Sequence, residues 1–252
     1  MTRAYAIGDI HGHLDKLEAA HALIAEDRAR CGDTDAPVVH IGDLVDRGPD
    51  SPGVIQFLID GQARGENWVV LKGNHDRMME MFLREQPMVD TQLLYDHNWL
   101  HPRIGGIETL ASYGVDVPEG SRTYQFHPKA RAAVPERHRD YLANLPSHYR
   151  LGDLYFAHAG IRPGLPLDQQ TEDDLCWIRK EFYDSNADHG PLIVHGHTPV
   201  DAVTHYGNRL NIDTGAGHGK AISAVVIEGR DAWVLGPSGR EGVTREDPIF
   251  PI

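Results

Sequence analysis

Carboxylates, imidazoles and one amide stand just after short apolar segments at five places along the chain. The first three places are Gly-Asp at residue 8, Gly-Asp at residue 42 and Gly-Asn at residue 73. Histidines follow two later apolar segments. Oxygen and imidazole donors without a thiolate suit Mn, Fe or Zn better than a soft metal or an all-oxygen calcium site. The candidate metal ligands are Asp9, His11, Asp43, Asn74, His158 and His197.

Each of these residues carries little information alone, because a Gly-Asp pair is most often a turn and a lone histidine is most often hydrogen-bonded. Together, six donors exceed what one open catalytic metal needs and are enough for two metals that share a carboxylate. Two metals about 3.5–4 Å apart form a clamp for in-line displacement at phosphorus, with a hydroxide between them as nucleophile. The set therefore predicts hydrolysis of a phosphoester with two divalent ions. We expect Mn²⁺, with Fe or Zn as alternatives.

The elements that must position these donors follow a βαβ pattern. Apolar segments at 5–7, 38–41 and 68–71 predict strands that each end at a donor. Helical sequence separates them, and successive strands lie about 30 residues apart, as in a βαβ unit. Segments 154–157 and 192–194 repeat the arrangement. Ligands of open α/β sheets bind outside the carboxyl ends of the strands, so we expect the donors to meet at one edge.

The rest of the chain does not follow the βαβ pattern. Residues 78–150 contain predicted helices at 78–85 and 135–145 but few strands, so we interpret them as an insertion in a single domain spanning 1–252. From residue 210 onward, short β segments predict an antiparallel meander, and the tail after Pro237 is expected to be loosely ordered. The meander segments are 210–212, 221–227 and 232–235.

Composition limits the partners of the chain. It has 252 residues, of which 40% are hydrophobic and 24% charged, and this balance excludes intrinsic disorder. Lys and Arg number 24 against 37 Asp and Glu, so the net charge of −13 disfavours nucleic acid and anionic membranes as partners. No apolar run approaches the roughly 20 residues of a membrane helix. Two cysteines cannot build a disulfide framework, and we expect a reducing, cytoplasmic location.

Three short blocks of sequence carry a resemblance to a known family. Residues 8–12 read Gly-Asp-Ile-His-Gly, residues 42–48 read Gly-Asp-Leu-Val-Asp-Arg-Gly, and residues 73–76 read Gly-Asn-His-Asp. With them the chain resembles the calcineurin-like metallophosphoesterases, and more narrowly the phosphoprotein phosphatase branch with its bacterial and phage-lambda-type serine/threonine phosphatases. The resemblance spans about residues 5–227. It implies a mixed α/β (α+β) fold, with a central β-sandwich of mixed sheets flanked by helices and a helical insertion. Further matching blocks lie at 158–160, 177–179, 196–199 and 212–215.

The resemblance also implies a role for each donor. His195 stands two residues before a matching histidine, but it matches no ligand position itself. The implied ligands are Asp9 and His11 for the first metal, Asp43 as the bridge, and Asn74, His158 and His197 for the second metal.

Four further residues are expected to bind the phosphoryl group or to help protonate the leaving group. His75 is the expected general acid, because a departing alkoxide needs a proton, and Asp46 would orient and stabilise its imidazole. Arg47 offers a planar fork for phosphate oxygens, and Arg179 matches the second phosphate-binding arginine of the family. Asn74 would touch the phosphate as well as the metal.

Two enzymatic functions fit this set of residues. The predicted function is a two-metal phosphomonoesterase that acts on phosphoserine and phosphothreonine in proteins. The alternative is a symmetrical dinucleoside polyphosphate hydrolase, acting on diadenosine tetraphosphate with the same scaffold. Such hydrolases typically lack the second aspartate of the Gly-Asp-x-x-Asp-Arg-Gly block, so Asp46 favours the protein phosphatase. A non-catalytic scaffold is disfavoured, because it would be expected to lose His75 or a ligand and all are present.

Overall fold

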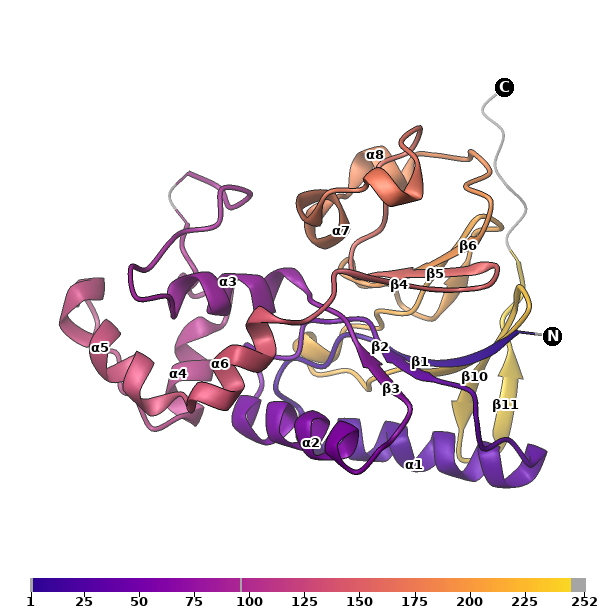
Figure 1. Ribbon diagram of the computed structural model, residues 1–252, viewed down its shortest axis with the longest axis horizontal. Coiled ribbons are helices and arrows are strands. Elements are labelled where there is room, and N and C mark those ends of the chain that lie inside the picture. Colours follow the sequence, from indigo (N-terminus) through magenta and orange to yellow (C-terminus); the bar gives the residue numbers. More distant parts are fainter. Residues whose placement is uncertain (1, 96, 246–252) are drawn as a thin grey trace.

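Two β-sheets form the centre of the computed structural model, which describes residues 2–95 and 97–245 (Figure 1). The first sheet contains β1 (Arg3–Ile7), β2 (Val38–His40), β3 (Trp68–Val70), β9 (Ala224–Glu228), β10 (Asp231–Gly236) and β11 (Gly239–Gly242). Its order is β11-β10-β9-β1-β2-β3. Strands β1, β2 and β3 are parallel, and the last three strands add an antiparallel meander beside β1.

The second sheet is also mixed. It contains β4 (His148–Leu151), β5 (Leu154–Ala157), β6 (Leu192–His195), β7 (Thr204–His205) and β8 (Arg209–Asn211). The order is β4-β5-β6-β8-β7, with three parallel central strands and an antiparallel strand at each edge. Parallel central strands send their carboxyl ends to the same edge of the sheet, as the site requires.

Alternating side chains explain how the two sheets stack. Ala6 of β1 and Phe156 of β5 belong to one buried cluster between the sheets. The neighbouring Tyr5 belongs to a cluster on the other face of the first sheet, which is covered by α1 (Leu14–Cys31) and α2 (Ser51–Ala63). Because successive strand residues point to opposite faces, one apolar strand serves both layers.

Helices cover the outer faces and one end of the sandwich (Figure 1). The outer face of the second sheet packs against α7 (Glu172–Trp177) and α8 (Lys180–Tyr183), with Tyr155 and Phe182 in one cluster. The described residues between β3 and β4 form helices and loops. These helices are α3 (Asn74–Phe82), α4 (Gly106–Ser112), α5 (Thr123–Ala133) and α6 (Glu136–Ala143).

The predicted fold class is confirmed, since two mixed sheets lie between helices. Two details of the prediction are wrong. The segment predicted at 210–212 is β8, which pairs with β6 in the second sheet instead of joining the meander. The tail after Pro237 is not loose at its start, because β11 forms a backbone ladder with β10. Of that tail, residues 246–252 lie outside the described part of the chain.

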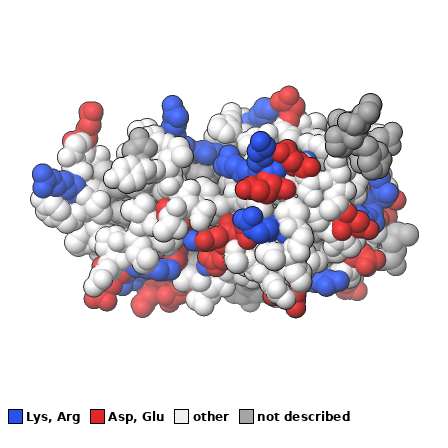
Figure 2. Space-filling model, turned by 90° about the horizontal axis from the view of Figure 1, so that it is seen from above, with Lys and Arg blue, Asp and Glu red and all other residues white. Residues whose placement is uncertain are grey.

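Surface charge is mixed on the face that carries α7 and α8. Figure 2 shows positive and negative side chains interspersed there, so the negative net charge is not spread evenly over this face. An anionic substrate can therefore meet locally positive surface despite the overall charge. Within residues 2–95 and 97–245, none of the helices is long and apolar enough to cross a membrane.

Candidate metal centre

The predicted donors meet where parallel strands of both sheets end. Those after β1, β2 and β3 are Asp9, His11, Asp43 and Asn74, and those after β5 and β6 are His158 and His197. Each of these side chains is buried, and none belongs to a residue more than 8% exposed. The sandwich therefore brings together residues that are far apart in sequence, as the strand-end pattern predicts.

The backbone around these donors is strained. Among the described residues, the non-glycine residues with a positive φ are His11 (49°), Asp43 (50°), Asp46 (75°), Arg47 (68°) and His197 (69°). Left-handed conformations of this kind cost free energy for residues with a Cβ, and they concentrate at functional sites. Gly73 allows a further close approach, since a Cβ there would lie 2.2 Å from the backbone nitrogen of Asp43. Strain and close packing thus coincide with the predicted ligands.

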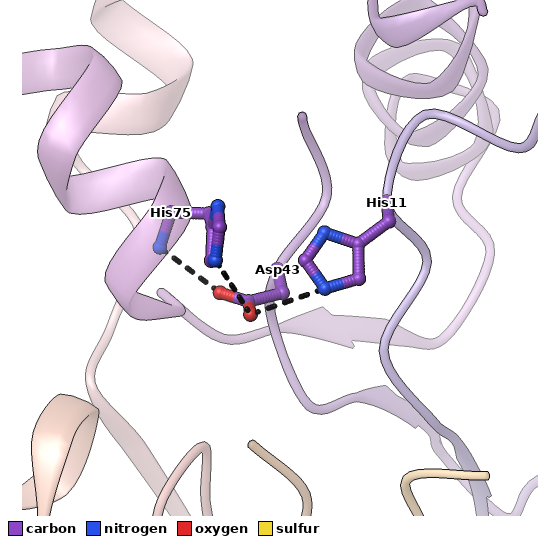
Figure 3. A group of neighbouring side chains, drawn as sticks. All are labelled: His11, Asp43 and His75. Carbon is purple, nitrogen blue, oxygen red and sulfur yellow. Dashed lines mark hydrogen bonds and ion pairs between the residues drawn. The ribbon is translucent and has the colours of Figure 1, made fainter. Parts of the chain in front are cut away.

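Asp43 lies at the centre of the cluster. Its Oδ2 atom is 3.5 Å from His11 Nε2 and 3.9 Å from His75 Nε2 (Figure 3). Its Oδ1 atom accepts a hydrogen bond from the His75 backbone N–H at 3.0 Å and lies 3.3 Å from His158 Nε2. Two groups could hold a metal ion, with ligand atoms within 4.8 Å of one another, and they are His11, Asp43 and His75, and Asp43, His158 and His197. Asp43 is common to both groups, as the bridging role requires.

The tautomers of the histidines test whether a cation fits. His158 Nδ1–H donates to the Ile41 carbonyl at 2.9 Å, so its Nε2 carries a lone pair. That Nε2 faces Asn74 Oδ1 at 3.0 Å and Asp43 Oδ1 at 3.3 Å, and these atoms are all acceptors. Burial also lowers the pKa of His158, which keeps the imidazole neutral. Three converging acceptors without a shared proton suit a cation.

His11 repeats this arrangement at the other group. Its Nδ1–H donates to the Val45 carbonyl at 3.0 Å, which leaves the lone pair of Nε2 directed toward Asp43. Burial lowers the pKa of His11 and that of His197 well below the usual value. Neutral imidazole is the form that binds metals.

Asp9 occupies a different position from the other donors. It lies outside the two compact groups, and it accepts a hydrogen bond from the His197 backbone N–H at 3.3 Å. The carboxyl group of Asp213 is hydrogen-bonded to it. Burial raises the pKa of both groups, that of Asp213 to about 6. Asp213 is absent from the predicted site, although its block at 212–215 is one of those that carry the resemblance.

His75, a member of the first group, also forms a buried pair with Asp46. His75 Nδ1–H donates to Asp46 Oδ2 at 2.6 Å, as the predicted acid and orienting carboxylate require. Asp46 is fully buried and also accepts hydrogen bonds from Trp99 and Thr109. The sequence predicts Trp99 only as a packing residue and does not single out Thr109. No periodic pattern marks these two positions, and they lie 53 and 63 residues from Asp46.

The two predicted arginines line the mouth of the site. Arg47 donates from Nη1 to His11 Nε2 at 3.2 Å and from Nη2 to His75 Nε2 at 3.3 Å. Arg179 is exposed and donates from Nε to His197 Nε2 at 3.0 Å. Both border a polar cavity of about 150 Å³, whose other lining residues are Asp9, His11, Asp43, Asn74, His75, His197, Pro199, Asp213, Gly215, Gly217 and His218.

Two neighbouring residues do not reach this cavity. Arg162 follows the His158 strand, but its Nε donates to Asp174 at 3.0 Å, and it does not border the cavity. His195 is buried inside β6, where Arg209 Nη1 approaches its Nε2 at 3.4 Å. It lies outside both metal-capable groups, as its failure to match a ligand position predicts.

Comparison with known families shows to which family the chain belongs. The family described as calcineurin-like phosphoesterase matches residues 2–226. The chain belongs to this family. The match covers both sheets up to β9, and therefore all the strand ends that carry the donors.

The similar proteins of the family include dinucleoside tetraphosphatases. The chain is 27% identical over 238 residues to the asymmetrical bis(5'-nucleosyl)-tetraphosphatase PrpE of Bacillus velezensis, covering 86% of each sequence. It is also 27% identical to the symmetrical bis(5'-nucleosyl)-tetraphosphatase of Neisseria meningitidis, covering 89% of this chain and 92% of the relative. A solved structure of a candidate diadenosine tetraphosphatase has the same fold, with a TM-score of 0.61, 22% identity and 93% coverage of both chains.

The predicted action on phosphoproteins is wrong. The relatives that match over most of this chain are named for dinucleoside tetraphosphates, which favours the alternative function. The prediction depended on Asp46. In the structure this carboxylate is fully buried behind His75 and does not border the cavity, so it has no contact with a substrate that could distinguish a protein from a nucleotide.

Proposed function

We propose that this protein hydrolyses dinucleoside polyphosphates, with diadenosine tetraphosphate as the representative substrate. The names of the relatives described above support this proposal. The polar cavity of about 150 Å³ between Arg47 and Arg179 supports hydrolysis of a phosphoryl group, and the names of the relatives carry the choice of a dinucleotide. The remainder of such a substrate would lie on the surface outside the cavity. A cytoplasmic location remains a prediction from the cysteine content.

We further propose that Asp43 bridges two divalent ions, for which Mn²⁺ is the expected metal. The unprotonated Nε2 of His158, which faces two oxygen acceptors, supports this assignment. Two bound ions would polarise the phosphoryl oxygens and activate a water for attack on phosphorus. The residues that would hold them are Asp9 and His11 for the first ion, Asn74, His158 and His197 for the second, and Asp43 for both.

The remaining groups act directly on the phosphoryl group. Arg47 and Arg179 would bind its non-bridging oxygens, and the Asn74 side chain would support them. His75, when protonated at both ring nitrogens, would donate the Nε2 proton to the departing oxygen. Asp46, which accepts from Nδ1–H, would orient the ring and stabilise its protonated form. A nucleoside phosphate leaves more easily than an alkoxide, so the proton from His75 should matter less for a dinucleotide than for an alkyl phosphate.

A direct competition tests the proposed substrate. The Mn²⁺-loaded protein is offered diadenosine tetraphosphate together with phosphoserine and phosphothreonine peptides, and kcat/KM is measured for each. We expect the dinucleotide to be preferred at least tenfold. Chromatography of the products identifies the bond that is cut, because ADP alone reports the central anhydride and AMP with ATP reports an outer one. Asp43→Asn protein, purified identically, controls for contaminating hydrolases, and preference for the peptides contradicts the proposal.

A further inference from the structure

The carboxylate of Asp46 is held by more than its histidine partner. Trp99 Nε1 donates to both carboxylate oxygens, at 3.1 and 3.0 Å. Thr109 Oγ1 donates to Oδ1 at 2.7 Å and accepts from the Asp46 backbone N–H at 2.9 Å. With His75 on Oδ2, both oxygens are occupied, and the group sits in a fully buried place. A buried carboxylate with this many fixed donors has one favoured orientation.

Residues 99–109, the segment that carries Trp99 and Thr109, also contact the backbone of Arg47, the residue after Asp46. Asp46 and Arg47 are consecutive and both left-handed, with φ of 75° and 68°. The Arg47 N–H donates to the Gly105 carbonyl at 3.4 Å. A Cβ on Gly105 would lie 2.5 Å from the Arg47 nitrogen, so only glycine permits this approach. Such backbone strain persists only where the surroundings over-determine it.

The segment 99–109 is itself well packed. The Trp99 ring lies 4.9 Å from Phe82 between ring centres, and the residue is only 3% exposed. A Cβ on Gly106 would lie 2.8 Å from the Trp99 ring, which shows how tightly the ends of the segment fit together. Thr109 is fully buried in α4. The segment can therefore hold a neighbour in place.

We propose that residues 99–109 form a brace that positions the proton donor, with Trp99 and Thr109 as positioning residues. They fix Asp46, Asp46 fixes the imidazole of His75, and Nε2 of His75 then faces the cavity. The inference rests on the proposed function only in the role of His75 as proton donor. The brace comes from the region between β3 and β4, so that region contributes to catalysis as well as covering the end of the sandwich.

Paired substitutions test the brace by kinetics. Trp99→Phe keeps an aromatic ring but removes the N–H, and Thr109→Val keeps the shape but removes the hydroxyl. For each variant, kcat is measured with an alkyl phosphate and with p-nitrophenyl phosphate, whose leaving group needs no proton. We expect a loss of about 10–100-fold for the alkyl phosphate, a much smaller loss for p-nitrophenyl phosphate, and unchanged metal content.

Matched controls separate positioning from packing. Trp68→Phe makes the same change in β3, where the ring stacks on Phe57 and does not border the cavity, and it should leave the hydrolysis of both substrates unaffected. Thr109→Ser restores the hydroxyl and should restore activity. In a His75→Asn background, Trp99→Phe should cause no further loss, since coupled residues are not additive. Equal losses with both substrates, or additive losses, overturn the proposal.

A spectroscopic measurement tests the brace without turnover. In metal-free, ¹⁵N-labelled protein, the short bond from His75 Nδ1–H should give a proton resonance downfield of the amides, assigned by its absence in His75→Asn. We expect Trp99→Phe to shift or broaden it and Trp68→Phe to leave it unchanged. An unchanged resonance in Trp99→Phe overturns the brace. If the dinucleotide is not hydrolysed but the resonance responds as expected, the proposed function fails and the brace stands.

Discussion

The metal-capable cluster and the His75–Asp46 pair use the same side chain in different surroundings. In the cluster, His11 and His158 donate from Nδ1 to backbone carbonyls, those of Val45 and Ile41. In the pair, His75 donates from Nδ1 to a carboxylate at 2.6 Å. A carbonyl fixes the tautomer without favouring positive charge, whereas a carboxylate also stabilises the imidazolium. Among His11, His158 and His75, the partner of Nδ1 therefore separates the histidines suited to bind a metal from the one suited to carry a proton.

A third kind of histidine limits this rule. His40 also donates from Nδ1 to a carbonyl, that of Val69 at 3.1 Å. Its Nε2 accepts from His21 Nε2 at 3.0 Å, beside Trp68. His40 belongs to neither metal-capable group, so a backbone carbonyl on Nδ1 is not sufficient for metal binding. His11 and His158 differ from it because their Nε2 atoms also face the Asp43 carboxylate.

The largest effect should follow removal of the shared carboxylate. Asp43→Asn should lower metal content at both sites, and we expect its loss of activity to exceed the about 10²–10⁴-fold that proton transfer contributes. Asp9→Asn should mainly empty one site, because Asp9 is assigned to the first ion alone, whereas Asp43 is assigned to both. Elemental analysis with parallel assays measures both. Full activity after exhaustive chelation, or normal metal content in Asp43→Asn, contradicts the shared-ligand assignment.

Removal of the proton donor, His75, should impair proton transfer without impairing metal binding. His75→Asn should lower kcat by about 10²–10⁴-fold for alkyl phosphates, with metal content nearly unchanged. The defect should shrink for p-nitrophenyl phosphate, and Asp46→Asn should give a milder defect of the same type. If His75→Asn loses a metal ion instead, His75 belongs with His11 and His158, and the distinction based on Nδ1 fails.

A smaller effect is expected from the arginines that connect the two regions. The Arg47 side chain donates to both His11 and His75, whereas the side chain of the exposed Arg179 donates to His197. We expect Arg47→Ala to lower kcat/KM by about 10²–10³-fold and Arg179→Ala to lower it less. Arg47→Lys keeps the charge but not the planar fork and should recover only part of the loss. Equal losses of kcat/KM in Arg47→Ala and Arg179→Ala would show that the contacts of Arg47 with both His11 and His75 do not contribute to the reaction.

The smallest effect concerns the histidine that has neither role. Burial lowers the pKa of His40 to about 4. His40 in the unfolded chain therefore binds a proton near pH 6.5, whereas in the folded protein it stays neutral down to about pH 4. As the pH drops from about 6.5 to 4, this difference lowers the free energy of unfolding by at most about 3 kcal/mol. Urea titrations of metal-free protein at several pH values measure it. His40→Gln should flatten the decline, and the exposed His148→Gln should not.

Strand ends and their donors could be predicted from the sequence because each depends on a short local pattern. An apolar segment followed by Asp43 or His158 indicates both a strand and where its side chains arrive. The sheet membership of 209–211 could not be predicted, because a short apolar segment does not specify its neighbour. The contacts of Trp99 and Thr109 with Asp46 could not be predicted for a similar reason. The two residues lie in a loop and a helix, and no rule of spacing relates them to Asp46. The sequence predicts Asp46 as the partner of His75, to which it is hydrogen-bonded, but the presence of Asp46 wrongly indicates a phosphoprotein substrate.

The division of the metal-capable cluster between two halves of the chain matters while the protein is being made. His11, Asp43 and His75 emerge early, whereas His158 and His197 emerge much later, and β1 waits for β9 before both its edges are paired. Until His158 and His197 are made, only Asp43 and Asn74 of the ligands proposed for the second ion exist. The complete site can therefore form only after the strands of both sheets have been synthesised.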